Sequence, residues 1–307
     1  MSNNHIKWKI KALIQNILSI VPFGVQLNYL LQKHVTKAYT TAAMINSYNV
    51  QIKQIDLLNR RESIENKRIL EIGPGWFSIS GLIFWLLKSK SIYWVDIRKN
   101  FKLDLTKRYA EALLSISNQV AKDIGVDVLE IQEKLMQVAL CQTDSDFFQL
   151  CNIKYDAPGD ARSIKAQDHT IDLIYSWGVL EHISWDHLCE IFENSVPLLS
   201  ASGRHYHNIG MQDHFHDTGI GNGVNFLKYS SVMWKLIAGN QFAFHNRKRK
   251  TDYLKLIDNN NFKINYHWEE LLEINLSALD KIKVHKEFQG YTREELACSH
   301  LLVEFGK

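Results

Sequence analysis

A glycine-rich turn joins two apolar segments in the first third of the sequence. Ile69-Leu70-Glu71-Ile72 predicts a short buried strand, Gly73-Pro74-Gly75 a tight turn, and the apolar residues up to about 88 a helix. Glycines at such a junction let a ligand approach the backbone, and the helix start offers free N–H groups. The next predicted strand ends in Asp96, whose carboxylate can accept both ribose hydroxyl protons of a nucleoside. Together these features indicate a nucleoside-containing cofactor.

Two classes of cofactor compete for this turn. The dinucleotide fingerprint needs a third glycine three residues after the second, but Ser78 occupies that position. The intervening residues are the bulky Trp76 and Phe77. A crowded turn suits a pyrophosphate poorly, but it can accept a thioether with an amino-acid tail. The spacing therefore favours S-adenosylmethionine (SAM), and an NAD(P)-dependent oxidoreductase remains the alternative.

The chain from about Arg68 to its C-terminus resembles the class I SAM-dependent methyltransferase family. The resemblance is carried by Leu70-Glu71-Ile72-Gly73-Pro74-Gly75, by Val95-Asp96, and by Asp172-Leu173-Ile174-Tyr175-Ser176 running into Gly178-Val179-Leu180-Glu181-His182-Ile183. It implies an α/β fold with a Rossmann-like, mostly parallel sheet of seven strands whose last strand is antiparallel, and SAM as the cofactor. The cofactor-binding residues that it implies are Glu71, Gly73 and Gly75 at the methionine part, Asp96 at the ribose, Asp160 and Ala161 at the adenine, and Ser176 and Trp177 closing over the cofactor.

Histidines gather where a later strand is predicted to end. His205, His207, His214 and His216 lie there together with Asp213. In open α/β sheets ligands bind beyond the carboxyl ends of the strands, and an imidazole can remove a proton from a hydroxyl or ammonium acceptor. We expect His207 or His214 to be the catalytic base, with Asp213 orienting the ring and His182 in reserve.

Each of these assignments has an alternative. His205 and His207 share one face of the predicted strand, so one of them can be a core histidine. Glu181-His182 can be a helix-start feature. The nitrogen and oxygen donors of the segment could also hold a metal ion, but they lack a fixed ligand spacing, and we expect no metal.

Three further residues are candidates for binding the methyl acceptor. Arg247 and Arg249 belong to a basic run, which either forms a solvated face or turns a guanidinium inward to hold an acidic substrate group. Asn225 follows a glycine-rich stretch, and we expect it in a flap over the acceptor.

Positioning these residues requires strands that alternate with helices. Strands are predicted at 69–72, 91–96, 152–155, 170–176, 204–209, 262–267 and 300–305, with helices between them. Such alternation calls for a parallel sheet covered on both faces. We expect residues 1–62 to form an N-terminal helical cap and residues 63–307 the α/β domain. A helical insertion is expected at about 100–150, and substrate-side insertions at about 210–260 and 270–298.

The composition limits the class of protein and its partners. With 307 residues, 46% of them hydrophobic, the chain can bury a large core, and its net charge of +3 offers no strong attraction for nucleic acid. The spacing of the four cysteines suggests neither a disulfide framework nor a cysteine zinc site. This favours a reduced, cytoplasmic compartment. The first predicted helix carries Lys7, Lys9 and Lys11 beside an apolar face, so weak contact with a membrane surface is an alternative to simple packing as a cap.

These features predict a cytoplasmic SAM-dependent methyltransferase that transfers a methyl group to an oxygen or nitrogen of a small-molecule metabolite. The alternatives are an NAD(P)-dependent oxidoreductase, a non-catalytic scaffold of the same fold, and a membrane-attached enzyme with a lipid-linked acceptor. Nothing in the sequence specifies an oligomeric state.

Overall fold

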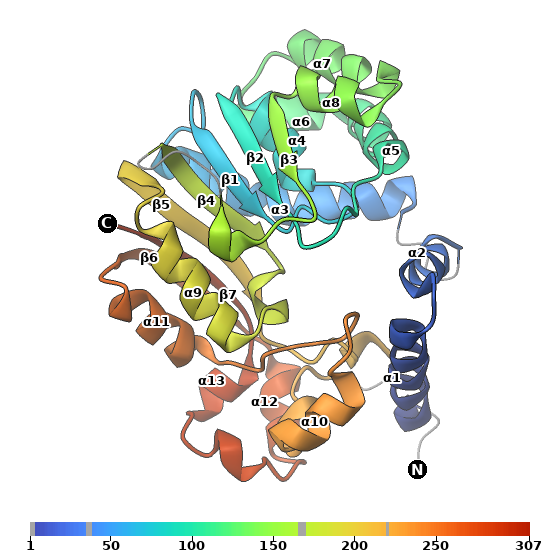
Figure 1. The fold of residues 1–307 in the computed structure, drawn as a ribbon, viewed down its shortest axis with the longest axis vertical. Helices are drawn as coiled ribbons and strands as arrows, with labels where there is room; N and C mark the ends of the chain where they lie inside the picture. The colour runs from blue at the N-terminus through green and yellow to red at the C-terminus, as the bar shows by residue number, and fades with distance from the viewer. Residues whose placement is uncertain (1–3, 35–38, 165–169, 219–220) are drawn as a thin grey trace. The chain divides into compact units, whose positions relative to one another are not determined.

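A seven-stranded sheet organises the computed structural model, which describes residues 4–34, 39–164, 170–218 and 221–307 (Figure 1). The strand order is β3-β2-β1-β4-β5-β7-β6. The strands are β1 (Arg68–Ile72), β2 (Ser91–Val95), β3 (Ile153–Asp156), β4 (Ile171–Trp177), β5 (Leu199–Gly210), β6 (Lys263–Leu271) and β7 (Cys298–Gly306). The α-helices are α1 (Asn4–Ile20), α2 (Gly24–His34), α3 (Thr41–Arg61), α4 (Ile79–Leu86), α5 (Leu103–Leu114), α6 (Ser117–Ile124), α7 (Val128–Leu140), α8 (Asp144–Leu150), α9 (Trp185–Ser195), α10 (Ser231–Ala238), α11 (Lys250–Asn259), α12 (Glu273–Leu279) and α13 (Arg293–Ala297).

The pairing of the strands confirms the predicted fold class. β1 pairs in parallel with β2 and with β4, and β2 pairs in parallel with β3. β6 and β7 pair antiparallel, as expected for two strands with no room for a crossover between them. The seven predicted strands are all present, because each is a short run of apolar or β-branched residues bounded by turn residues.

The described residues form two compact units, which we describe separately. The first, here called the loop unit, comprises residues 32–176 and 197–206. In it, β1 and β2 are almost wholly buried. Helices α5 to α8 lie between β2 and β3 in the chain, and α7 packs on both α5 and α6 (Figure 1). Trp94 of β2 contacts the rings of Phe101 and Phe147 at 5.7 Å and 6.1 Å, so the insertion extends the aromatic core of this unit.

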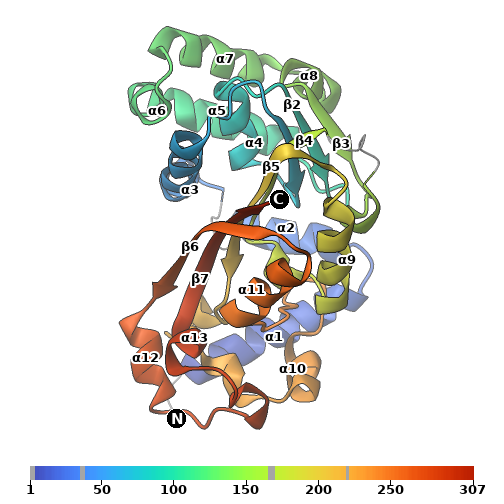
Figure 2. The ribbon, with the colours of Figure 1, turned by 90° about the vertical axis from the view of Figure 1, so that its left-hand side faces the viewer.

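The second unit, here called the histidine unit, comprises residues 1–31, 177–196 and 207–307. Figure 2 shows β6 and β7 side by side, with α12 and α13 at the end where β6 finishes and β7 begins. A separate hydrophobic cluster joins the N-terminal helix to the insertions; its large members include Trp8, Phe215, Phe226 and Trp234.

The N-terminal segment is helical, but its helices divide between the units. Residues 1–31 group with the histidine unit, where Trp8 of α1 contacts Phe215 at 5.7 Å and Asn16 donates a hydrogen bond to the carbonyl of Ile237 at 3.1 Å. Helix α3 belongs to the loop unit and packs on α4, α5 and α6. No helix among the described residues has both the length and the apolar content needed to cross a bilayer.

Candidate functional site

The turn after β1 adopts the conformation that its glycines allow. Gly73 and Gly75 both have φ near +71°, a region that side-chain-bearing residues seldom occupy. Gly73 donates its N–H to the carbonyl of Val95 at 2.9 Å, which ties the turn to the end of β2. Apart from the neighbouring residues of the chain, no described atom lies within 4 Å of the point where a Cβ of Gly75 would be. The turn therefore leaves open space beside its backbone.

Asp96 lies directly beside this turn, at the end of β2. Its Oδ2 accepts the N–H of Gly75 at 3.3 Å and its Oδ1 accepts the N–H of Arg98 at 3.1 Å. Burial raises the pKa of this carboxyl, and the two N–H donors oppose that rise. The side chain keeps 8% exposure, so the carboxylate is held in place while remaining partly accessible. It can accept hydroxyl protons from a ligand in the space next to Gly75.

Glu71 has a different role from the one we predicted. Instead of facing a ligand, its buried carboxylate accepts the hydroxyls of Ser78 at 2.8 Å and of Ser80 at 2.6 Å. Ser78 in turn caps α4 by accepting the N–H of Gly81 at 2.7 Å. Glu71 thus stabilises the turn by binding the two serines that follow it. These hydrogen bonds replace the cofactor contact that we expected for Glu71.

The two bulky residues of the turn are occupied by neighbours within the loop unit. Phe77 contacts the rings of Tyr39 and Tyr109 at 6.1 Å and 5.6 Å. The ring of Trp76 lies 5.8 Å from Nζ of Lys102, a distance at which a cation–π contact forms.

The remaining predicted cofactor residues follow the next strand ends. Asp160 caps the short helix 161–163 that contains Ala161, and its carboxylate pairs with Arg162 at 2.7 Å. The turn that contains it is tied to the end of β2, because Gly159 donates its N–H to the carbonyl of Asp96 at 2.8 Å. Ser176 is fully buried near the end of β4, and Trp177 is the last residue of that strand. Contact of these four residues with a cofactor remains a prediction.

His207 is a core histidine, which corrects its assignment as the base. It is 1% exposed and packs against the rings of Phe192 and Phe305, at 6.0 Å and 5.8 Å between ring centroids. Burial lowers its pKa to about 3, because the apolar surroundings disfavour the charged ring. A general base must reach the proton that it removes, and a side chain enclosed in this way does not.

The carboxylate of Asp213 does not orient the ring of His207 or His214, contrary to our expectation, although the backbone carbonyl of Asp213 lies 2.9 Å from Nδ1 of His216. Its Oδ1 accepts the N–H of Phe215 at 2.8 Å and its Oδ2 accepts the amide of Asn225 at 3.3 Å. Burial raises the pKa of Asp213 to about 6. The pair of Asp213 and the buried Asn225 therefore shapes the loop after β5, so the structure gives Asn225 a structural partner in place of the expected flap position.

The two arginines proposed to hold an acidic substrate group are buried and hydrogen-bonded to groups of the protein itself. Arg249 is fully buried and donates to the carbonyls of Glu295, Met211 and Cys298 at 3.1, 2.6 and 2.8 Å. Arg247 donates to the carbonyl of Tyr229 at 2.7 Å and to Ser231, and its guanidinium lies 5.0 Å from the ring of Phe288. Both prefer these partners because a buried guanidinium is costly unless its N–H groups are bonded. The prediction that these two arginines bind the substrate is therefore wrong.

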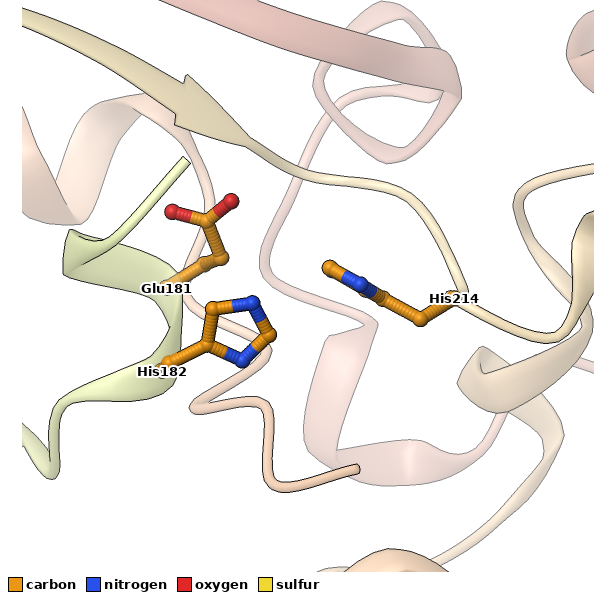
Figure 3. A group of neighbouring side chains, drawn as sticks. All are labelled: Glu181, His182 and His214. Atoms are coloured by element: carbon orange, nitrogen blue, oxygen red, sulfur yellow. The ribbon is translucent and has the colours of Figure 1, made fainter. Parts of the chain in front are cut away.

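His214 and His182, by contrast, are brought together with Glu181 (Figure 3). The two imidazole rings lie 4.7 Å apart between centroids, and one donor atom from each of the three residues lies within 4.8 Å of the others. Glu181 and His182 come from the short helix 180–182 after β4, and His214 comes from the loop after β5. Burial raises the pKa of Glu181 and lowers that of His214 to about 3.

Sequence reasoning missed a fourth member of this neighbourhood, His245. Its Nε2 lies 3.1 Å from the carbonyl of Gly210, and its Nδ1 accepts the N–H of Arg247 at 2.8 Å. Its ring lies 5.2 Å from that of His214. His245 stands 31 positions after His214 in the sequence, outside any recognisable motif, so only the folded chain places it here.

Comparison with protein-family models gives no match, and comparison with curated proteins gives no significant match. Among solved structures, the chain is similar to a geranyl diphosphate methyltransferase in complex with SAM, at 10% identity over 86% of this chain and 89% of that chain (TM-score 0.46). It is also similar to a SAM-dependent methyltransferase from Mesorhizobium loti, at 14% identity over 80% of this chain and 92% of that chain (TM-score 0.43). A third is a geranyl diphosphate C-methyltransferase from Streptomyces coelicolor A3(2) in complex with Mg²⁺, geranyl diphosphate and S-adenosyl-L-homocysteine, at 9% identity over 86% of this chain and 82% of that chain (TM-score 0.45).

Proposed function

We propose that this chain is a SAM-dependent methyltransferase that acts on a small molecule. The observation that carries the proposal is the open space beside Gly75, next to the held carboxylate of Asp96. A nucleoside ribose would bind Asp96 there, and the left-handed glycines would let the amino-acid part of SAM approach the backbone.

The start of α4 favours SAM over a dinucleotide. A pyrophosphate binds free N–H groups at a helix N-terminus. In this chain the N–H of Gly81 is already taken by Ser78, and the acidic Glu71 lies directly behind Ser78. The position is therefore poor for a second negative charge, whereas the positively charged sulfonium of SAM needs no such N–H groups.

We propose oxygen or nitrogen as the acceptor atom because the histidine unit offers an imidazole, that of His182, that can take a proton. SAM supplies an electrophilic methyl group on its sulfonium, so the protein has to align the acceptor and remove its proton. His182 donates Nδ1–H to the carbonyl of Phe244 at 2.7 Å, which leaves the lone pair of Nε2 available. His214 has a buried Nε2 with no partner in the described part of the chain.

Calorimetric titration with S-adenosylhomocysteine tests the cofactor assignment. The wild-type chain should bind the ligand, and Asp96→Ala should lose about 1.5–3 kcal/mol of binding free energy, or about 10- to 150-fold in affinity, the range for hydrogen bonds to a charged group. Glu65→Ala removes an exposed carboxylate of the same unit and is the matched control. A chain that is stabilised by NADPH and indifferent to S-adenosylhomocysteine would instead be the oxidoreductase.

We further propose that α1 attaches the chain to an anionic membrane surface. Ile10, Leu13 and Ile17 are 50%, 59% and 49% exposed and recur on one face of α1, whereas Trp8 and Ala12 are buried on the other. At about 100° per residue, the exposed Lys7 and Lys9 border this apolar face. The sequence contains no acidic residue before Asp56. An apolar face edged by lysines matches the boundary between acyl chains and anionic headgroups.

Co-sedimentation with vesicles tests this attachment. The wild-type chain should bind vesicles that contain phosphatidylserine more strongly than pure phosphatidylcholine, and added salt should weaken the binding. Ile17→Glu should lower the bound fraction about tenfold or more, because it places a charge on the exposed face that would enter the membrane. Leu129→Glu changes a residue of α7 that is 69% exposed and should bind as wild type. Concentration-dependent dimerisation without vesicle binding would show that a second copy covers the face, and would refute membrane attachment.

A further inference from the structure

Three potential metal ligands converge in the histidine unit, at Glu181, His182 and His214 (Figure 3). Their donor atoms lie within 4.8 Å of one another, although His214 is 32 positions from His182 in the sequence. Four-coordinate zinc, with bonds of about 2.0–2.1 Å to nitrogen and oxygen, holds its ligand atoms about 3.3 Å apart. Small side-chain rotations would bring the three donors to that spacing.

Backbone groups orient two of the three side chains, and all three keep a donor atom available. Glu181 accepts the N–H of Gly210 with Oε1 at 3.0 Å. His182 gives Nδ1–H to the carbonyl of Phe244, the outer-shell arrangement that usually orients a metal-binding imidazole. In the described structure, Oε2 of Glu181 and Nε2 of His214 are buried without a hydrogen-bond partner.

These two unpartnered atoms are costly in a protein that does not use them. A buried polar atom without a partner has given up its hydrogen bonds to water and gained none in return. The carboxylate is moreover closely enclosed, because a Cβ on Gly210 would lie 2.6 Å from Oε1 of Glu181. A cation between Glu181, His182 and His214 would satisfy both atoms at once.

We propose that Glu181, His182 and His214 bind a divalent transition-metal ion of the zinc type. Two imidazoles and one carboxylate suit Zn²⁺ or a neighbouring first-row ion, whereas Mg²⁺ and Ca²⁺ prefer sites made of oxygen. His245 is not a ligand, because hydrogen bonds occupy both of its nitrogens. His182 is exposed, so the ion has positions open to solvent, as catalytic zinc sites do.

The site deepens the proposed function, although metal binding itself does not depend on it. An ion with an open position binds an oxygen of a second ligand and lowers the pKa of that hydroxyl. The three residues would hold the ion, and the ion would make a hydroxyl group bound to it within the histidine unit more acidic. Hydroxyl and carboxylate compounds are the class of ligand that fits the open positions.

Titration of the chelator-treated full chain with Zn²⁺ alone tests the site, with Co²⁺ as a spectroscopic probe. We expect one ion per chain and a Co²⁺ absorption spectrum typical of mixed nitrogen and oxygen ligands. Glu181→Gln, His182→Gln and His214→Gln should each weaken binding by about 10- to 100-fold, because losing a ligand costs at least as much as losing an outer-shell partner. His187→Gln changes an exposed histidine of α9 and should bind as wild type.

Two results would refute the proposed metal site. One is a wild-type chain that binds neither ion. The other is zinc binding that survives all three ligand variants. Circular dichroism of each variant separates loss of a ligand from loss of the fold, and His182→Gln is the safest variant because its side chain is exposed. S-adenosylhomocysteine binding on the same samples keeps the proposals apart: a chain that binds it without zinc refutes only the metal site, and a chain that binds zinc without it refutes only the proposed function.

Discussion

Replacing His207 should change how the stability of the chain depends on pH. Burial against Phe192 and Phe305 lowers the pKa of His207 from 6.5 to about 3. Between these values the unfolded chain binds a proton that the folded chain excludes. The contribution of His207 to stability is therefore complete above about pH 6.5 and is lost progressively as the pH falls toward 3.

The size of the effect follows from the two pKa values. Between about pH 7.5 and pH 5, a shift from 6.5 to about 3 removes about 2 kcal/mol of unfolding free energy. In His207→Gln this loss should disappear, since an amide does not titrate. Other titrating groups affect both proteins alike and cancel in the difference.

Urea denaturation at the two pH values measures this difference. His187→Gln, at an exposed position of α9, is the control and should keep the wild-type dependence on pH. A difference between wild type and His207→Gln below about 0.5 kcal/mol would refute the buried, neutral state of His207. The result also distinguishes a core histidine from a general base. A base near its ordinary pKa would show no such loss of unfolding free energy at low pH.

Two further predictions concern packing and buried charge. Gly81→Ala should destabilise the chain by about 1–2 kcal/mol in urea unfolding, because the new Cβ would lie 2.6 Å from the Trp94 ring. This overpacking outweighs the better helix propensity of alanine. An unchanged urea midpoint would contradict the close packing of Gly81 on Trp94. Arg249→Met should lower the free energy of unfolding by about 3 kcal/mol or more, because three buried carbonyls lose their donor. The control Lys250→Met breaks an ion pair with Glu269 near the surface and should lower it by less than about 1 kcal/mol. Equal losses in the two variants would contradict the burial of Arg249.

The loop unit could largely be predicted from the sequence. Strand, turn and helix follow one another within a few residues around Gly73 and Gly75, and Asp96 ends the next strand. Their arrangement depends on local backbone preferences and on the parallel pairing of adjacent strands. The role of Glu71 was not predictable in the same way, because it depends on which side of the turn the hydroxyls of Ser78 and Ser80 occupy.

By itself, the sequence determined the seven strands, the open turn and the presence of several histidines near one strand end. Only the tertiary structure decided which histidines are enclosed in the core and which meet other potential ligands. His207 and His214 stand seven positions apart, yet one is enclosed by aromatic rings and the other meets Glu181 and His182. The physical reason is that the propensity of a residue is local, whereas its burial and partners depend on contacts between segments far apart in the chain. The same reason explains why Arg247 and Arg249, in what reads as a solvated basic run, are buried against backbone carbonyls.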